Sequence, residues 1–251
     1  MFYKPVINKF REMGKEDDLE RIKEAFNEHE ARYIQRIKPL PSKPSRLLGQ
    51  NGLHYIQLSL FRSKALLEGV VTSVNSGNGL LAMLATRAHF ETTGGLSCFF
   101  KKLRSFYDSV ITYEELDKAL FKLILGTRAG EIEKVTESFN VLTMIDTVDE
   151  YFTHISPRRV QTFRKTYELL SEYCHPNFSG ITIGAQWEKN IGIVGFKQSL
   201  ELLNEDLAVS SYLLISTTAF LRFYDMCFSL LSENEELPII VGNNAHTTNA
   251  T

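Results

Sequence analysis

The sequence has few cysteines, and their number is odd. Only Cys98, Cys174 and Cys227 occur among its 251 residues, and no two of them lie close together in the chain. A framework of disulfide bonds is therefore not expected, and isolated thiols are typical of a reducing compartment. No cysteine pair has the spacing of a zinc site, and the six histidines include no H-E-x-x-H sequence. We therefore expect no metal site.

Motifs that bind nucleotides or activate a nucleophile are also missing. The glycine-containing segments 75–79 and 180–195 match neither the Walker A nor the dinucleotide-binding pattern, so we expect no cofactor. No G-x-S-x-G sequence occurs, and Ser171 falls inside an expected helix, where an activated nucleophile is unusual. The formal net charge of −2 excludes a surface coated with basic groups, although a local basic pocket stays compatible with it.

Membrane and export signals are weak. The N-terminal sequence MFYKPVINKF contains no apolar run long enough for a signal peptide. The most apolar stretch, residues 207–231, has the length of a membrane span but contains Arg222 and Asp225, which are costly inside a bilayer. We interpret it as the core helix of a soluble protein that does not enter a membrane, and the cytoplasm is the expected location.

The pattern that is present is helical. Apolar residues recur at intervals of three and four along most of the chain, which predicts an all-α fold, a multi-helix bundle. Between residues 181 and 194, β-branched residues around turn formers are compatible with one small β-hairpin or an ordered loop. The expected helices span residues 15–38, 54–74, 80–106 (interrupted at Gly94-Gly95), 112–126, 139–152, 156–174 and 200–231.

Proline and polar residues suggest the domain organisation. Three prolines within Lys38–Ser45 rule out helix there and mark a linker. Residues 1–45 are therefore interpreted as an N-terminal helical arm and its linker, and the arm is expected to pack on the body or on a partner subunit. Residues 46–240 form the expected helical domain, and the polar residues 241–251 a disordered tail.

The segment Tyr167–Asn177, YELLSEYCHPN, is the best candidate site in the sequence. His175 ends the expected helix because the residue before Pro176 is pushed out of the helical region. In a functional interpretation, His175 is a general acid/base or a phosphate contact, with Tyr173, Asn177 and Tyr167 as binding neighbours. In a structural interpretation, the same residues only terminate the helix.

A second candidate lies on the expected helix 80–106. A helical wheel places Glu91 near the middle of an apolar face that includes Leu84, with Arg87 at its edge and His89 on the opposite, exposed side. A carboxylate in a core stripe needs a partner, and Arg87, one turn away, is the natural one. The pair either lines a polar pocket in which Arg87 holds an anion, or is a buried structural ion pair.

These residues also carry a resemblance. The order R-x-x-x-E (Arg87–Glu91) followed by Y-x-x-L-S-x-x-x-H-P-N (Tyr167–Asn177) resembles a group of uncharacterised bacterial helical proteins. More loosely, the chain is similar to the HEPN superfamily, which implies a metal-independent ribonuclease or effector of a toxin–antitoxin or antiviral defence system, acting as a homodimer. Those proteins place an Arg four to six residues before the His, so here the resemblance assigns that role to Arg87 from a neighbouring helix.

Two functional hypotheses follow. In the first, the protein is a HEPN-like ribonuclease that binds RNA, with His175, Arg87 and Glu91 as catalytic residues: His175 moves the proton of a ribose hydroxyl, and Arg87, positioned by Glu91, stabilises charge on the phosphate. In the second, it is a noncatalytic helical binding or scaffold protein that acts through a protein partner.

Overall fold

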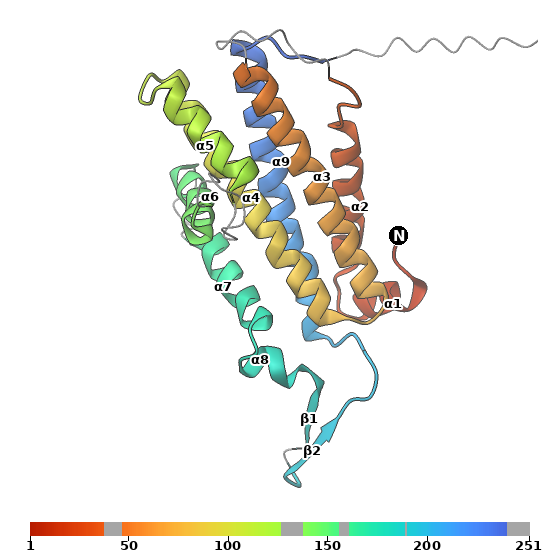
Figure 1. Ribbon diagram of the computed structural model, residues 1–251. Helices are drawn as coiled ribbons and strands as arrows, with labels where there is room; N and C mark the ends of the chain where they lie inside the picture. The colour runs from red at the N-terminus through yellow and green to blue at the C-terminus, as the bar shows by residue number, and fades with distance from the viewer. Residues whose placement is uncertain (38–46, 127–137, 156–160, 189, 240–251) are drawn as a thin grey trace, which may run out of the picture.

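The computed structural model describes residues 1–37, 47–126, 138–155, 161–188 and 190–239, which form long helices and a small hairpin (Figure 1). The helices are α1 (Lys4–Glu12), α2 (Glu16–Ala31), α3 (Leu47–Asn75), α4 (Gly79–Tyr107), α5 (Tyr113–Leu125), α6 (Val141–Ile155), α7 (Thr162–Cys174), α8 (Phe178–Ile181) and α9 (Ala208–Asn234), with short 3-10 helices η3 (Thr182–Gly184) and η4 (Glu205–Leu207). Strands β1 (Ala185–Glu188) and β2 (Ile193–Phe196) pair antiparallel. The expected all-α bundle with one hairpin is confirmed.

Helix α4 is the centre of the fold. It packs against α3 and α9 on one side and against α6 and α7 on the other, and it also contacts α5 (Figure 1). Helix α2 lies against α9 and α3, and α1 lies against α2. The core between these helices is built from large apolar side chains that are fully buried, among them Phe10, Phe90, Phe99, Phe220 and Phe223.

The rotation of α4 differs from the expected one. Leu84, expected in a buried apolar face, is only half-buried, whereas His89, expected at the surface, is fully buried. The physical reason is that α4 is covered on two opposite sides, so no single apolar stripe describes it. Polar residues such as Thr86 and Thr93 occupy buried positions because their hydroxyls donate to the carbonyl of the preceding helical turn.

The expected interruption at Gly94-Gly95 is also wrong, since α4 runs unbroken from Gly79 to Tyr107. Another helix comes close to α4 at this point. A Cβ atom added at Gly94 would lie 3.0 Å from the backbone carbonyl carbon of Met144 on α6. The missing side chain therefore allows α6 to approach the backbone of α4.

Helices α5 and α7 are capped in different ways at their N-termini, α5 by its own residues and α7 by a residue of α6. At the start of α5, the Thr112 hydroxyl accepts from the N–H of Glu115, and the Glu115 carboxylate accepts from the N–H of Thr112, which together form a capping box. The start of α7 is capped from another helix. Asp149 of α6 accepts from the N–H groups of Phe163 and Arg164. These two bonds lower the pKa of the Asp149 carboxyl, but burial raises it by more.

Several expectations concern residues that the structure does not describe. The expected helix start at Ser156-Pro157, the linker Lys38–Ser45 and the tail 241–251 lie outside the described residues. Helix α2 ends at Ala31 rather than at Lys38, and α1 was not anticipated. The described chain just before the linker is joined to the C-terminal segment, because Ile37 forms an isolated β-bridge with Ile239.

A chain of hydrogen bonds crosses the core between α2, α3, α4 and α9. The Nδ1 atom of His29 lies 2.7 Å from the carbonyl oxygen of Ala25, and its Nε2 lies 2.7 Å from the Ser63 hydroxyl. The same hydroxyl lies 2.7 Å from Nε2 of His89, whose Nδ1 lies 2.7 Å from the Ser216 hydroxyl. All four side chains are fully buried, so these hydrogen bonds connect four helices without contact with water.

Helix α9 is the segment discussed above as a membrane-span candidate. Together with η4, it is long and apolar enough by composition to cross a membrane, over Glu205–Asn234, and 61% of its most apolar window is buried. Its buried side chains pack against α4, α3 and α2. Two of its charged residues make polar contacts with other helices: Asp225 accepts both bonds of a bidentate pair with Arg32, and Arg222 donates to the Tyr151 hydroxyl.

Candidate functional site

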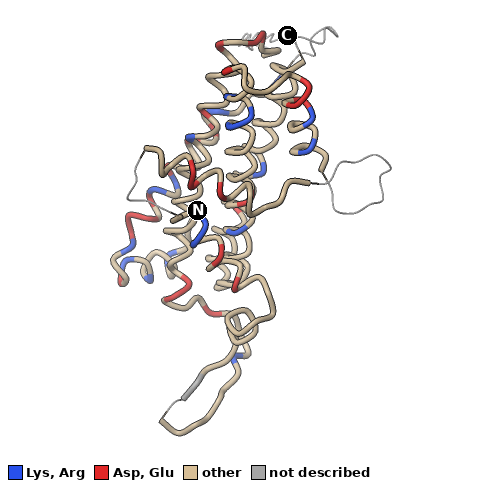
Figure 2. Tube along the Cα trace, turned by 90° about the vertical axis from the view of Figure 1, so that its left-hand side faces the viewer, with Lys and Arg blue, Asp and Glu red and all other residues tan. Residues whose placement is uncertain are grey.

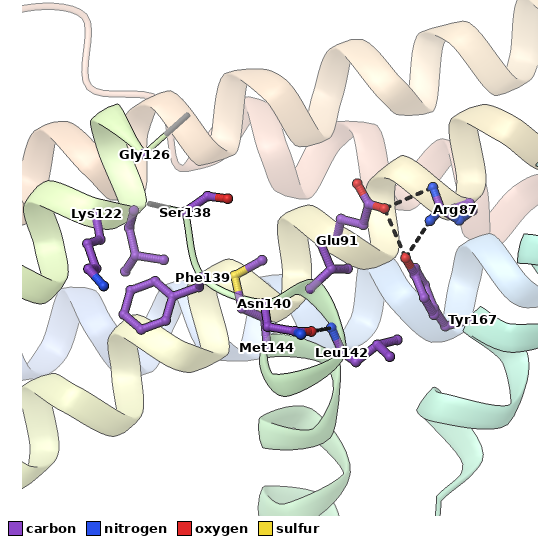
Figure 3. A pocket seen from close by; sticks show the side chains of 12 residues that line it. Arg87, Glu91, Lys122, Gly126, Ser138, Phe139, Asn140, Leu142, Met144 and Tyr167 are labelled. Atoms are coloured by element: carbon purple, nitrogen blue, oxygen red, sulfur yellow. Dashed lines mark hydrogen bonds and ion pairs between the residues drawn. The ribbon is translucent and has the colours of Figure 1, made fainter. Parts of the chain in front are cut away.

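A pocket of about 760 Å³ lies where α4, α5, α6 and α7 meet (Figure 3). Gly126 at the end of α5 and Ser138 before α6 border it on one side, and the polar residues of α4 and α7 border it on the other. The described residues that line it are Arg87, Glu91, Lys122, Leu123, Gly126, Ser138, Phe139, Asn140, Val141, Leu142, Met144 and Tyr167.

Arg87 is held rigidly at the pocket wall. Its NH1 atom lies 2.9 Å from Oε1 of Glu91, its NH2 donates to the Tyr167 hydroxyl at 2.5 Å, and its Nε donates to the Ser171 hydroxyl at 3.1 Å. The guanidinium also lies over the Tyr167 ring, 4.8 Å from the ring centroid. A guanidinium has five N–H donors, so two remain after these three bonds.

Glu91 belongs to the pocket rather than to the core. Its expected position in the middle of a buried stripe is wrong: its side chain is 26% exposed, close to the 25% of Arg87. The rotation of α4 turns both side chains toward the space between α6 and α7. Glu91 Oε1 accepts from Arg87 and, at 3.1 Å, from the Tyr167 hydroxyl, whereas Figure 3 shows the second carboxylate oxygen pointing away from Arg87.

The electrostatic environment affects the tyrosine most. Burial raises the pKa of Tyr167 to about 12, and the negative charge of Glu91 acts in the same direction. Tyr167 is therefore a neutral hydrogen-bond donor at physiological pH. It fixes the Arg87–Glu91 pair in one geometry and is poorly suited to act as a base.

The opposite wall carries a second cation and apolar groups. Lys122 of α5 lies over the Phe139 ring, with its Nζ 5.7 Å from the ring centroid. None of the ion pairs among the described residues includes Lys122. Asn140 accepts from the N–H of Leu142 at 2.9 Å, which holds the chain at the start of α6. The described lining thus contains two cations, one carboxylate and several apolar side chains.

The His-Pro-Asn segment is arranged differently from the pocket. His175 is exposed, has extended backbone angles (φ −99°, ψ 150°) and is not among the residues that line the pocket. The Asn177 side chain donates to Glu172 at 2.7 Å, while its Oδ1 is buried and has no partner among the described residues. A Cβ atom at Gly180 would collide with the carbonyl oxygen of His175, so this glycine permits the tight turn.

Tyr173 lies apart from Tyr167 although both belong to α7. Burial raises the pKa of Tyr173, and the nearby charges of Asp206 and Glu205 act in the same direction, which places its hydroxyl near η4. The structure therefore brings together Arg87, Glu91 and Tyr167 and does not bring Tyr173, His175 or Asn177 to the same pocket.

Three residues of the site were not singled out from the sequence. Ser171 was considered only as a nucleophile, but its hydroxyl accepts from Arg87 and donates to the carbonyl of Tyr167 one turn earlier. Lys122 and Asn140 reach the pocket from α5 and from the start of α6. Ser171 follows Tyr167 by four residues on α7, and this spacing indicates that the two side chains lie on the same side of the helix. The positions of Lys122 and Asn140 at the pocket depend on tertiary packing.

The arrangement favours binding over chemistry. A nucleophile beside a base, or two groups placed for proton transfer, does not occur among the described lining residues. A search of the described residues finds no group of three or more His, Cys, Asp or Glu side chains placed to hold a metal ion. Comparisons of the chain with protein-family models, with curated proteins and with solved structures find no match.

Proposed function

We propose that the protein is a noncatalytic helical binding protein whose α4–α7 pocket takes a small organic anion. The single observation that supports this is the fixed, partly exposed Arg87 on the wall of a 760 Å³ pocket in which Lys122 supplies a second positive charge. The size is that of sites for small ligands, which bury mostly apolar area around a few placed polar groups.

The lining defines the chemical class of the ligand. The two unused N–H groups of Arg87 and the ammonium group of Lys122 suit a carboxylate or a phosphate ester. Phe139, Leu142 and Met144 provide apolar contacts for a carbon body. The outward oxygen of Glu91 can accept from a hydroxyl or amine on the same ligand, and one added monovalent anion would balance the charge of the described lining.

Aromatic anions are expected to stabilise the protein. Phenyl phosphate and benzoate at tenfold excess over Kd should add about 1.4 kcal/mol to the free energy of unfolding, on the order of 3 to 5 °C in Tm for a chain of this length. In a thermal-shift assay, Lys122→Met should need about ten times more ligand than the wild type for the same increase in Tm, as expected for the loss of one charge-assisted hydrogen bond.

Matched controls make that result specific. Lys118→Met removes a lysine one turn earlier on α5 that is exposed and does not line the pocket, so it should respond like the wild type. Benzyl alcohol and benzylamine test whether the negative charge is needed. Equal stabilisation by benzylamine, or an equal loss of response in both lysine variants, would contradict anion binding in this pocket.

The ribonuclease hypothesis predicts cleavage of RNA, whereas the proposed binding function predicts none. Because His175 is exposed and does not line the pocket with Arg87 and Glu91, we expect purified protein to leave cellular RNA intact, with or without EDTA. Gel analysis of the RNA should give the same result for wild type, His175→Ala and the exposed control His154→Ala. Cleavage that survives EDTA and is lost only in His175→Ala would instead support the nuclease.

A further inference from the structure

One face of the bundle, formed by α3 and α4, is apolar and exposed. Three large side chains on it are 49–65% exposed, and small side chains lie between them. We call it the α3–α4 face and define it by six residues: Leu58, Phe61, Arg62, Ala65, Leu81 and Ala85. A contiguous apolar patch on the surface of a protein is a typical mark of an interaction site.

The spacing of the apolar residues places them on one side of each helix. Leu58, Phe61 and Ala65 follow one another on α3 at intervals of three and four residues. Leu81 and Ala85 are four residues apart on α4, so they also share one side. Each helix therefore presents an apolar stripe of its own to the α3–α4 face.

Two contacts between the helices join these stripes. The Nε atom of Arg62 donates to the Thr92 hydroxyl at 3.1 Å, and a Cβ atom added at Gly69 would lie 3.9 Å from the Cβ atom of Ala85. The position on α3 advances by seven residues between these contacts while the position on α4 falls by seven, so the helices run antiparallel. The face extends from Phe61 toward Leu81 over about three helical turns, on the order of 18 Å.

Arg62 is the single charged residue of the α3–α4 face. None of the ion pairs among the described residues includes it. The Thr92 hydroxyl that accepts from Arg62 donates in turn to the Ala88 carbonyl at 2.9 Å, which fixes the position of the guanidinium. Four of the five N–H groups of the guanidinium remain after this bond, and they suit a carboxylate of a partner.

The charge of the face distinguishes between possible occupants. Two copies of this chain that met through the face would bury two Arg62 side chains without a carboxylate to pair them. The flanking carboxylates of Glu68 and Glu91 already have ion-pair partners on their own helices. Anionic membranes attract clusters of basic residues, whereas Lys and Arg are interspersed with Asp and Glu along the helices (Figure 2). A different protein that carries a carboxylate fits the face best.

The shape of the face favours a helix as the binding element. Helix α5 already packs against both α3 and α4, in the part of the pair near the end of α4 (Figure 1). Along the α3–α4 face, the small residues Ala65, Gly69 and Ala85 leave room for another helix to approach closely, since the distance between packed helices depends on the side chains at the contact. An amphipathic helix presents apolar side chains at matching intervals of three and four residues.

We propose that the α3–α4 face binds an amphipathic helix of another protein. The apolar side chains of that helix cover Leu58, Phe61 and Leu81, and one of its carboxylates pairs with Arg62. The contact is separate from the α4–α7 pocket, because Arg87 lies on the side of α4 opposite Ala85.

Fluorescence anisotropy with synthetic peptides tests this proposal on the full chain. The probe is a labelled alanine-rich peptide of about 18 residues, long enough to form a helix, with leucines at intervals of three and four residues and one glutamate beside them. A second peptide has arginine in place of the glutamate. The wild type should bind the glutamate peptide at least about tenfold more tightly than the arginine peptide, and Arg62→Glu should reverse this preference.

Matched variants locate the binding site. Phe61→Gln should weaken binding of the glutamate peptide at least about tenfold, whereas Phe178→Gln, which changes an exposed phenylalanine of α8, should leave it unchanged. Arg104→Glu changes an exposed arginine of α4 outside the face and should keep the wild-type preference. Melting curves should show that the variants are folded. If Arg62→Glu does not fold, the two peptides and Phe61→Gln decide.

Several results would overturn the proposal. They are no binding of the glutamate peptide at millimolar protein, equal binding of both peptides by the wild type, or an equal effect of Phe61→Gln and Phe178→Gln. A dimer in sedimentation equilibrium that Phe61→Gln dissociates would instead assign the face to a second copy. Cosedimentation with phosphatidylglycerol vesicles that Phe61→Gln abolishes would assign it to a membrane.

Discussion

Lowering the pH from 7 to 4 is expected to reduce the free energy of unfolding by about 3 kcal/mol through His89 alone. The cause is the buried hydrogen-bond chain. The Ala25 carbonyl can only accept, so Nδ1 of His29 donates to it and Nε2 accepts from Ser63. The Ser63 oxygen then accepts from His89, whose Nδ1 accepts from Ser216. This order of donors and acceptors exists only while both rings are neutral.

The sign of the effect follows from the direction of the pKa shift. Burial lowers the pKa of His89 from 6.5 to about 3. The positive charge of Arg62, and the charge that His29 gains when it is protonated, act in the same direction. The unfolded chain therefore takes up the proton first. The stabilising contribution is complete above pH 6.5, declines as the pH falls toward 3, and does not decline further below that.

Other groups around the two rings modify this effect. Burial lowers the pKa of His29 as well, with Arg32 and Lys64 acting in the same direction and Glu28 against it. Raised pKa values of buried carboxyls, such as that of Asp206, contribute with the opposite sign, since a carboxyl that is neutral in the fold stabilises it on acidification. The contribution of His89 must therefore be measured as a difference between variants.

Urea unfolding at pH 7, 6, 5 and 4 gives that difference. The free energies of unfolding of the wild type and His89→Leu should converge as the pH falls, because only the wild type has the buried ring to protonate. His154→Leu, which removes an exposed histidine of α6, should stay parallel to the wild type. A gap between wild type and His89→Leu that is the same at pH 7 and pH 4 would show that His89 does not behave as described.

At pH 7, His89→Leu is expected to cost about 2–4 kcal/mol of stability, since two buried hydroxyls lose a partner and each unsatisfied group costs about 1–3 kcal/mol. Ser63 keeps its bond to His29, and Ser216 keeps a contact with Thr93 at 3.0 Å, which is why the loss is not larger. The variant also loses the edge contact of the His89 ring with Phe220, whose centroid lies 5.8 Å away. The midpoint of urea unfolding measures the change.

The control for this loss is the same side-chain change at His154. Because that residue is exposed at the end of α6, His154→Leu should shift the urea midpoint by less than about 0.5 kcal/mol in equivalent free energy. A similarly small shift for His89→Leu would mean that the buried chain contributes little to stability.

The fold could be predicted from the sequence where the determining contacts are local. The capping box at Thr112 and the end of α5 at Gly126 involve residues within one helical turn, so their signals are complete in the sequence. The rotation of α4 could not be predicted, because it depends on which helices cover it. His29 and His89 are 60 positions apart in the chain, and only the packing of α2, α3 and α4 places both rings within hydrogen-bond distance of Ser63.

The candidate site was predictable to the same extent. The Arg87–Glu91 ion pair follows from i,i+4 spacing, and the segment containing Tyr167 was recognised. The sequence did not indicate that Tyr167 would donate to that pair across two helices, or that Lys122 would face it. The attention given to His175 came from a sequence motif whose tight turn has a local explanation in Gly180.

The most direct test of the central claim is an amide-detected NMR titration of the full chain with phenyl phosphate. Anion binding in the α4–α7 pocket predicts that the largest shift changes occur around Arg87, Lys122 and Asn140, with saturation, and that they are reduced in Lys122→Met. Saturating shift changes confined to the hairpin, or no change at millimolar ligand, would contradict it.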